Sequence, residues 1–151
     1  MYHKILVPLD GSELAECVLP HVEAIAKGCG VKEIKFLRVI EPWRDHPHYY
    51  TTQPLLQIMS ELKVDAESYL DKVVNDNKYE DVDTKSEVIE GKAADIIADY
   101  ATKENIDLII IATHGRSGVS RWVRGSVADR ILHSACVPVL LIRAPGCVPG
   151  F

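Results

Sequence analysis

The amino-acid sequence predicts an α/β fold: a single doubly wound open sheet of five parallel strands with helices on both faces. Three observations lead to this prediction. The chain has 151 residues, which fits one domain spanning residues 1–151 around one hydrophobic core. Its most apolar runs lack polar alternation, as strands buried on both faces do. Segments with helical periodicity fill the gaps between these runs, so strands and helices alternate along the chain.

The strands are predicted from runs of β-branched and apolar residues. Three runs are nearly uninterrupted, at residues 4–9, 34–40 and 106–113. In the third, the stretch from Leu108 to Ala112 has no polar side chain, so this strand is predicted to be the most buried. A similar run extends from Val137 to Ile142, and the more alternating residues 84–89 fit an edge strand.

The helices are predicted from four apolar stripes with helical spacing. They are Leu14, Val18, Val22 and Ile25; Leu55, Met59, Leu62, Ala66, Tyr69 and Val73; Ala93, Ile96, Ile97, Tyr100 and Ala101; and Val127, Ile131 and Leu132. Pro20 falls within the first stripe, where it removes a backbone donor, and is therefore expected to kink that helix.

Residues 41–54 contain three prolines and clustered aromatic residues and are predicted to form a loop. Asp45, His46 and His48 in this loop belong to types that bind metals. One short tract offers no supporting groups around such ligands, so a solvated loop is the favoured interpretation and no metal site is predicted.

The composition argues against several classes of partner and site. Seventeen Lys and Arg against 22 Asp and Glu give a net charge of −5, which disfavours a nucleic-acid or membrane-surface binder with a broad basic face. No apolar run approaches the roughly 18–20 residues of a membrane span, and the chain starts in a strand pattern instead of a signal peptide. We therefore expect a cytoplasmic protein without a nucleic-acid or membrane partner. The four cysteines form no C-x-x-C pair, so neither a zinc nor a redox motif is indicated.

Residues that directly follow parallel strands are the first site candidates, because ligands bind at the carboxyl ends of such strands. Asp10 and Ser12 follow the first strand. They fit either a ligand site or a simple cap for the helix that follows. Val39 and Ile40 end the second strand and could flank a flat ring or belong to the core.

The loop after residues 106–113 is rich in glycine and arginine. Its glycines are Gly115, Gly118 and Gly125, and its arginines are Arg116, Arg121 and Arg124, with no acidic residue between them. Glycines let a backbone approach a ligand, and Gly125 with Ser126 would present free amides at the start of the fourth helix. The pattern is typical of a phosphate cradle, and a solvated turn is the alternative.

Familiar nucleotide and hydrolase motifs are absent. Gly91-Lys92 is followed by alanine and lacks the earlier glycine of a P-loop, and Gly28-Cys29-Gly30 precedes a strand instead of following one. No G-x-S-x-G elbow is present, and His114 and His133 have no evident nucleophile partner. A P-loop NTPase, a Rossmann dehydrogenase and a catalytic triad are therefore disfavoured.

The glycine loop resembles that of nucleotide-binding members of the universal stress protein family, which carry G-x2-G-x9-G-[ST] at this place. Gly115, nine residues and then Gly125-Ser126 match this spacing, whereas Ala112 stands where the first glycine is usual. The segments 5–12, 38–40, 91–94 and 136–142 also resemble the family, so the similarity covers nearly the whole chain.

The resemblance implies a Rossmann-like sheet, of the adenine nucleotide alpha hydrolase-like type, with strand order 3-2-1-4-5. It also implies an ATP site between the first and fourth strands, with Mg²⁺ bound through the phosphates. Asp10 would meet the ribose or adenine, while Pro8, Leu9 and Val39 would line the adenine pocket. The residues around ribose and phosphates would be Ala112, His114, Gly115, Arg116, Gly125, Ser126 and Val127.

Family members typically form homodimers through the last strand. The strand from Val137 to Ile142 is apolar on both faces and would otherwise leave a hydrophobic sheet edge, which is an independent reason to expect pairing.

The resemblance favours an ATP-binding regulatory or stress-response protein with little or no hydrolysis. The enzymatic alternative on the same scaffold is a slow ATPase or an adenylating enzyme. An ATP pyrophosphatase or adenylating enzyme would need an S-G-G-x-D-S-like loop, which the residues from Asp10 to Glu13 do not supply. A response-regulator-like switch would need paired acids after the first strand, where Asp10 is single. A nucleotide-free interaction module remains the stronger rival, against which the retained Gly115, Gly125 and Ser126 argue.

Overall fold

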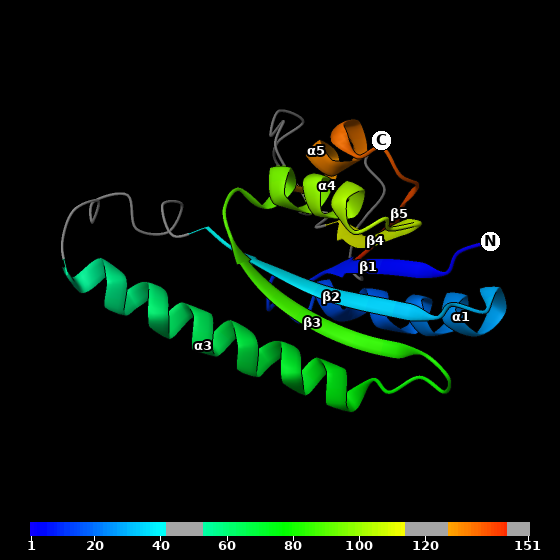
Figure 1. The fold of residues 1–151 in the computed structure, drawn as a ribbon, viewed down its shortest axis with the longest axis horizontal. Coiled ribbons are helices and arrows are strands. Elements are labelled where there is room, and N and C mark those ends of the chain that lie inside the picture. Colours follow the sequence, from blue (N-terminus) through cyan, green and yellow to red (C-terminus); the bar gives the residue numbers. More distant parts are fainter. Residues whose placement is uncertain (42–52, 114–126, 145–151) are drawn as a thin grey trace.

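A computed structural model describes residues 1–41, 53–113 and 127–144. The elements follow in the order β1 (Lys4–Pro8), η1 (Ala15–Val18), α1 (Leu19–Cys29), β2 (Glu33–Ile40), α3 (Gln53–Asp76), β3 (Asp83–Glu90), α4 (Ala93–Lys103), β4 (Leu108–Thr113), α5 (Val127–Ser134) and β5 (Val139–Arg143). The strands are all parallel and lie in the order β3-β2-β1-β4-β5 (Figure 1). The predicted fold class and strand order are confirmed, and residues 84–89 belong to an edge strand.

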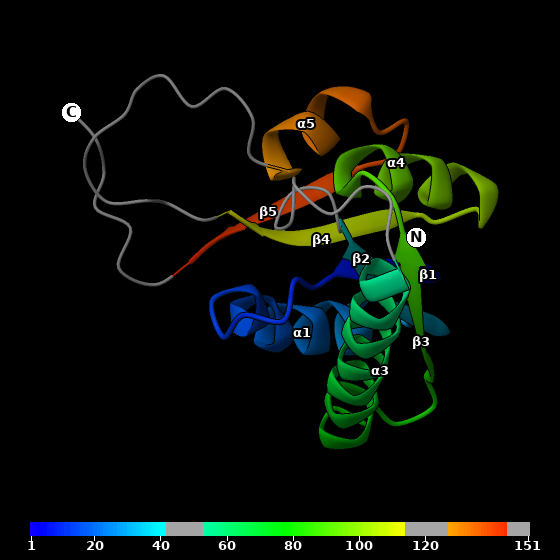
Figure 2. The ribbon, with the colours of Figure 1, turned by 90° about the vertical axis from the view of Figure 1, so that its left-hand side faces the viewer.

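The core lies in two layers, one on each face of the sheet. Figure 2 shows α1 and α3 on one side of the strands and α4 and α5 on the other. The layer under α1 and α3 includes Val22, Phe36, Leu70 and Ile110, and the layer under α4 and α5 includes Leu6, Ile97, Ile109 and Ile131. Neighbouring residues of one strand point to opposite faces, so a strand covered on both sides is apolar throughout.

The first helical segment differs from its prediction. The α-helix begins only at Leu19, so Pro20 lies in its first turn, where a backbone N–H has no partner within the helix and proline costs nothing. The residues from Ala15 to Val18 form the 3₁₀ turn η1 instead. The prediction of one longer, kinked α-helix is therefore wrong.

The helix α3 begins earlier than the loop prediction allowed. It starts at Gln53, so the predicted loop end at residue 54 is helical, again with a proline in the first turn. The buried Ala66, Leu70 and Val73 fix its C-terminal half to the core. None of the helices in the described part of the chain is both long and apolar enough to cross a membrane.

Asp107 ties the start of β4 to the start of the chain. Its Oδ2 accepts hydrogen bonds from the backbone N–H of His3 at 2.8 Å and of Lys4 at 2.9 Å. Its own N–H donates to the Lys4 carbonyl at 2.9 Å. The two backbone N–H groups, His3 first and then Lys4, lower the pKa of the Asp107 carboxyl below its ordinary value.

We expect Asp107→Ala to lower the free energy of unfolding at neutral pH by about 1–2 kcal/mol, because two backbone donors lose a charged acceptor. Because folding lowers this pKa, the contribution is fully present above the unfolded value, about 3.9, and is lost as the pH falls through the folded value. Urea titrations from neutral pH to about pH 3 measure the effect. Asp107→Asn keeps an acceptor oxygen and should lose less. Parallel stability curves for parent and Asp107→Ala down to acid pH would contradict this role.

Candidate nucleotide site at the carboxyl ends of β1 and β4

The strand order places a topological switch point between β1 and β4. The chain leaves β1 toward β2 on one side, and β4 returns on the other side of β1. In open parallel sheets, ligands bind at the carboxyl ends of the strands at such a point. Figure 2 looks at the molecule from the side on which the strands end.

The backbone pairing at this point ends early. β1 pairs with β2 as far as Pro8 and Leu37, and the Leu9 N–H continues with a 2.9 Å bond to the Leu37 carbonyl. By contrast, β1 and β4 pair only at Ile5 with Leu108 and at Leu6 with Ile109. The last residues of both strands are therefore not paired across this boundary, as expected where strands diverge at a switch point.

The structure places the described members of the predicted site on both sides of this edge. Pro8, Leu9 and Ala112 are buried, Asp10 is exposed, and Val39 and Val127 are half-buried. The side chains of Leu9 and Ala112 pack in the core layer under α1 and α3, whereas Val39 and Val127 contact the layer under α4 and α5. Five predicted residues lie outside the described ranges: His114, Gly115, Arg116, Gly125 and Ser126.

The turn after β1 shows how Asp10 and Ser12 are used, which the sequence left open between a ligand site and support for the following helix. Asp10 Oδ1 accepts hydrogen bonds from the Ser12 N–H at 2.9 Å and from the Ser12 hydroxyl at 2.6 Å. The Ser12 hydroxyl oxygen in turn accepts from the Ala15 N–H at 3.2 Å. The Ser12 hydroxyl therefore provides an acceptor for the N–H of the first residue of η1, and the exposed Asp10 shapes the turn that presents it at the edge of the sheet.

Two residues beside this turn, Arg38 and Tyr69, were not predicted as site residues. Arg38, near the end of β2, lies with its guanidinium carbon 5.3 Å from the centroid of the Tyr69 ring on α3. From the sequence, Tyr69 belongs to an apolar helical stripe and Arg38 to a strand, so neither stands out. The available signal was the position of an arginine in a largely apolar strand close to its carboxyl end.

Tyr69 stands in a polar environment. Its hydroxyl oxygen is buried and makes no hydrogen bond of normal geometry within the described residues. Burial first, and then the nearby carboxylate of Glu16, raise the pKa of the Tyr69 phenol, with a further contribution from Asp10, while Arg38 acts in the opposite direction. Arg38 is thus the positive group among two carboxylates and a phenol.

A second polar cluster lies away from this edge, between β2 and α4. Lys35 Nζ contacts Glu104 at 2.6 Å and the Tyr100 hydroxyl at 3.3 Å, and that hydroxyl donates to Glu87 at 2.6 Å. Burial, followed by the Glu87 contact, raises the pKa of Tyr100 to about 12. Burial opposes the charge on Lys35, but its hydrogen bonds to Glu104 and Tyr100 outweigh burial and raise its pKa. Perturbed pKa values can mark functional sites, but here burial and the contacts within the cluster explain them, so we interpret the cluster as structural.

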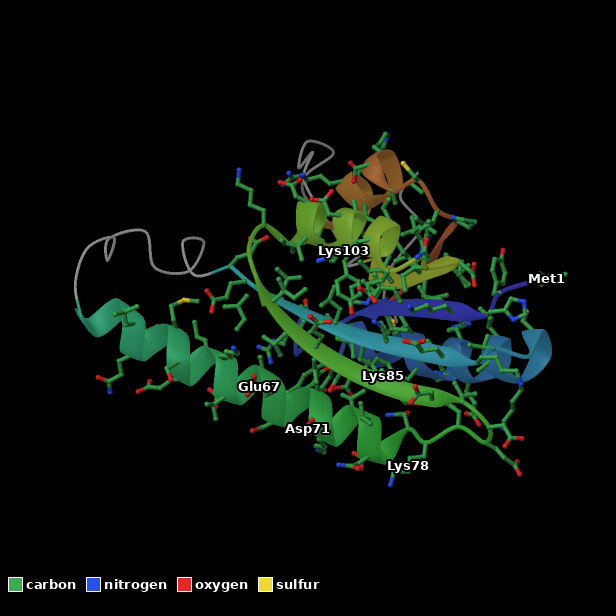
Figure 3. All side chains as sticks on the ribbon, in the orientation of Figure 1. Met1, Glu67, Asp71, Lys78, Lys85 and Lys103 are labelled. Carbon is green, nitrogen blue, oxygen red and sulfur yellow. The ribbon has the colours of Figure 1, made fainter. Side chains whose placement is uncertain are left out.

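A shallow groove of about 350 Å³ runs between α3 and β3, at the far edge of the sheet from β5. Glu67 and Asp71, labelled on α3 in Figure 3, contribute to its lining. No group of three or more His, Cys, Asp or Glu residues within the described ranges is arranged to hold a metal ion. Asp45, His46 and His48 lie outside those ranges. The groove therefore offers no metal chemistry, and the switch point is the better candidate site.

Comparisons with known proteins agree with this architecture. Residues 1–143 match the Universal stress protein family. The chain is 32% identical over 148 residues to universal stress protein MJ0531 of Methanocaldococcus jannaschii, covering 96% of this chain and 84% of that protein. It is 30% identical over 158 residues to universal stress protein MJ0577 of the same organism, covering 95% and 96%. A solved structure of MJ0577 superposes with a TM-score of 0.80 at 26% identity, covering 97% of this chain and 99% of that one.

Two more distant solved structures with the same fold carry nucleotides. One is a universal stress protein in complex with cAMP, with a TM-score of 0.65, 17% identity and coverage of 95% and 98%. The other is a universal stress protein family protein from Arabidopsis thaliana with AMP bound, with a TM-score of 0.67, 16% identity and coverage of 95% and 93%. At these identities the likeness extends to the fold. From the family match over residues 1–143 and the identity to MJ0531, we conclude that the chain belongs to the universal stress protein family.

Proposed function

We propose that this protein binds an adenine nucleotide, ATP with Mg²⁺, at the switch point between β1 and β4, and acts as a nucleotide-dependent regulatory protein of the stress response with little or no hydrolysis. One observation carries the proposal. The β1–β4 ladder ends at Leu6 and Ile109, so the carboxyl ends of both strands are unpaired across the point where parallel sheets bind ligands. Two proteins of the same fold hold cAMP and AMP, which supports an adenine nucleotide as the ligand class.

The chemistry of the described residues suits a nucleoside. In this proposal the exposed carboxylate of Asp10 accepts hydrogen bonds from the ribose or adenine. Val39 presents a half-buried apolar surface to the ring and its backbone groups to the ring nitrogens. The side chains of Leu9 and Ala112 are almost fully buried in the core, so in this proposal these residues offer backbone groups to the ligand. Pro8 helps to shape the wall of the adenine pocket.

The phosphates are assigned to the glycine and arginine segment that directly follows β4. In this proposal His114, Gly115, Arg116, Gly125 and Ser126 surround them, and Val127 begins the helix α5 whose first amides face the charge. Mg²⁺ takes oxygen ligands and usually keeps several waters, binding through substrate phosphates and one or two carboxylates. The described residues supply Asp10 and Ser12 oxygens but no dedicated metal cage, which fits an ion held through the phosphates.

Thermal unfolding with and without ATP and Mg²⁺ tests the proposal. A ligand that binds only the folded state, at about 100 times its Kd, adds about 2.7 kcal/mol. For a domain of this size that should raise the Tm by about 5–10 °C. Mass spectrometry of nucleotide released from the denatured purified protein should identify the ligand. An unchanged melting curve at millimolar ATP would refute nucleotide binding and favour the interaction-module alternative.

Steady-state hydrolysis separates the regulatory protein from an enzyme. We expect negligible phosphate release, because Asp10 and Ser12 are engaged with each other and form no evident pair for activating water. Turnover of about 1 per second or faster would instead favour the ATPase or adenylating alternative.

We further propose a homodimer that forms through β5 and its counterpart in a second copy. The predicted strand from Val137 to Ile142 corresponds to β5 at the sheet edge. Val139 and Leu141 contact one core layer and Leu140 and Ile142 the other, yet all four remain half-buried in the single chain. An apolar edge strand with unpaired backbone groups favours pairing with another strand.

The backbone of β5 indicates which groups would pair. The Ile109 N–H donates to the Pro138 carbonyl and the Ala144 N–H donates to the Thr113 carbonyl, so even-numbered residues bond to β4. Because backbone groups alternate in direction along a strand, Val139 and Leu141 direct their N–H and carbonyl groups away from β4. A two-fold axis would then pair the two β5 strands in an isologous contact.

A further inference from the structure

The side chain of Arg38 from β2 lies against Gly11, the residue after Asp10. Gly11 has φ of +86°, a region that glycine adopts without strain. A Cβ at this position would lie 2.9 Å from Cζ of Arg38 and 3.0 Å from each of its two Nη atoms. These nearly equal distances mean that the flat face of the guanidinium lies against the Gly11 backbone. Even an alanine side chain would displace it.

The same guanidinium is held from α3. Its carbon lies 5.3 Å from the centroid of the Tyr69 ring, within the range in which a cation is attracted to an aromatic face. Tyr69 is in turn adjacent on α3 to the fully buried Leu70 and packs against the core layer under α1 and α3. Arg38 therefore connects a rigid helix, the end of β2 and the turn after β1.

This contact bears on the turn that presents Asp10. Within the turn, Asp10 Oδ1 accepts hydrogen bonds from both the N–H and the hydroxyl of Ser12. These two bonds hold the turn together. Leu9, the residue before Asp10, is held to β2 by the 2.9 Å bond from its N–H to the Leu37 carbonyl. Arg38 supplies the support beyond this bond, because its guanidinium covers Gly11 directly.

We propose that Arg38 is a positioning residue for the adenine nucleotide: with its guanidinium against the Gly11 backbone and near the Tyr69 ring, it holds the turn so that Asp10 faces the nucleoside part of the ligand. This inference rests on the proposed function. In this proposal Arg38 acts through the turn and makes no contact with the phosphates.

Calorimetry with adenosine, AMP and ATP tests this role. We expect Arg38→Met, which keeps the apolar stem and removes the guanidinium, to weaken binding of all three ligands by the same factor of about ten. Tyr69→Leu, which removes the ring, should weaken binding in the same way. Tyr69→Phe is the matched control, because it keeps the ring and removes only the buried hydroxyl, and it should bind as the parent does.

Amide hydrogen exchange in the absence of ligand tests the positioning itself. The Ser12 and Ala15 N–H groups donate within the turn, so both should exchange faster in Arg38→Met and at the parental rate in Tyr69→Phe. A purely structural role for Arg38 would lower the Tm without changing ligand affinity well below the Tm.

Each alternative outcome has a distinct meaning. A loss of affinity that grows from adenosine to ATP would mean direct contact with the phosphates and would overturn the positioning role. Parental affinity in Arg38→Met, or unchanged exchange at Ser12, would also overturn it. If the parent binds none of the three ligands, the proposed function itself fails, whereas the exchange experiment still reports whether Arg38 orders the turn.

Discussion

Replacing Gly125 with valine is expected to abolish ATP binding while the fold is retained. The glycine motif assigns Gly125 to the start of the last helix, where the phosphates would lie against free backbone amides. A branched side chain there would collide with phosphate oxygens or force the turn open. We expect calorimetry to show a loss of at least about 100-fold, or about 2.8 kcal/mol.

The fold should survive because its core lies elsewhere. The strands β1, β2 and β4 contribute buried residues to both core layers, so circular dichroism of Gly125→Val should be nearly unchanged. Arg121→Ala is the control within the same segment. If Arg121 contributes only a diffuse positive field, its loss should weaken binding modestly and mainly at low salt. Parental affinity in Gly125→Val would mean that this segment does not hold the nucleotide.

The second large effect is expected at β5, where Leu141→Pro should convert the proposed dimer into a monomer. The Leu141 N–H points away from β4, so proline there removes a donor of the dimer contact but none of the bonds to β4. The preceding residue is already in a strand, the conformation that proline favours before it. Light scattering at micromolar concentration should give a mass near 16.8 kDa for the variant and twice that for the parent.

Leu141→Ala separates backbone pairing from side-chain packing. It loses the same contacts with the core layer under α4 and α5 but keeps the outward N–H, so it should remain dimeric. A charge at Val139 or Leu141 should weaken the dimer or unfold the chain, because both side chains pack on the core. A monomeric parent, or a Leu141→Pro variant that stays dimeric, would refute pairing through β5.

The sequence determined the architecture because its strands are covered on both faces. Runs such as Leu108 to Ala112 can be apolar throughout only if helices pack on either side, and the observed β4 is buried along nearly its whole length. The order 3-2-1-4-5 came from the resemblance to a family and not from the runs themselves. Local rules failed at Pro20 and at residue 54, because a proline inside an apolar stripe is compatible with a helix start as well as a kink.

The position of the candidate site was also accessible from the sequence, since any acid directly after a parallel strand must lie at the carboxyl edge. Asp10 does so, and the hydroxyl of its partner Ser12 turned out to accept a hydrogen bond from the Ala15 N–H as well. Which of two roles a short polar residue takes depends on hydrogen-bond distances that a sequence does not contain.

Only the tertiary structure decided what surrounds the Asp10 turn. Arg38, Tyr69 and Gly11 are far apart in the chain, and their meeting depends on the packing of α3 against β2 and on the +86° φ of Gly11. The early end of the β1–β4 ladder is likewise a property of how two distant strands diverge. Sequence periodicity specifies which face of an element is buried, whereas contacts between elements depend on their relative placement, which the packed core alone fixes.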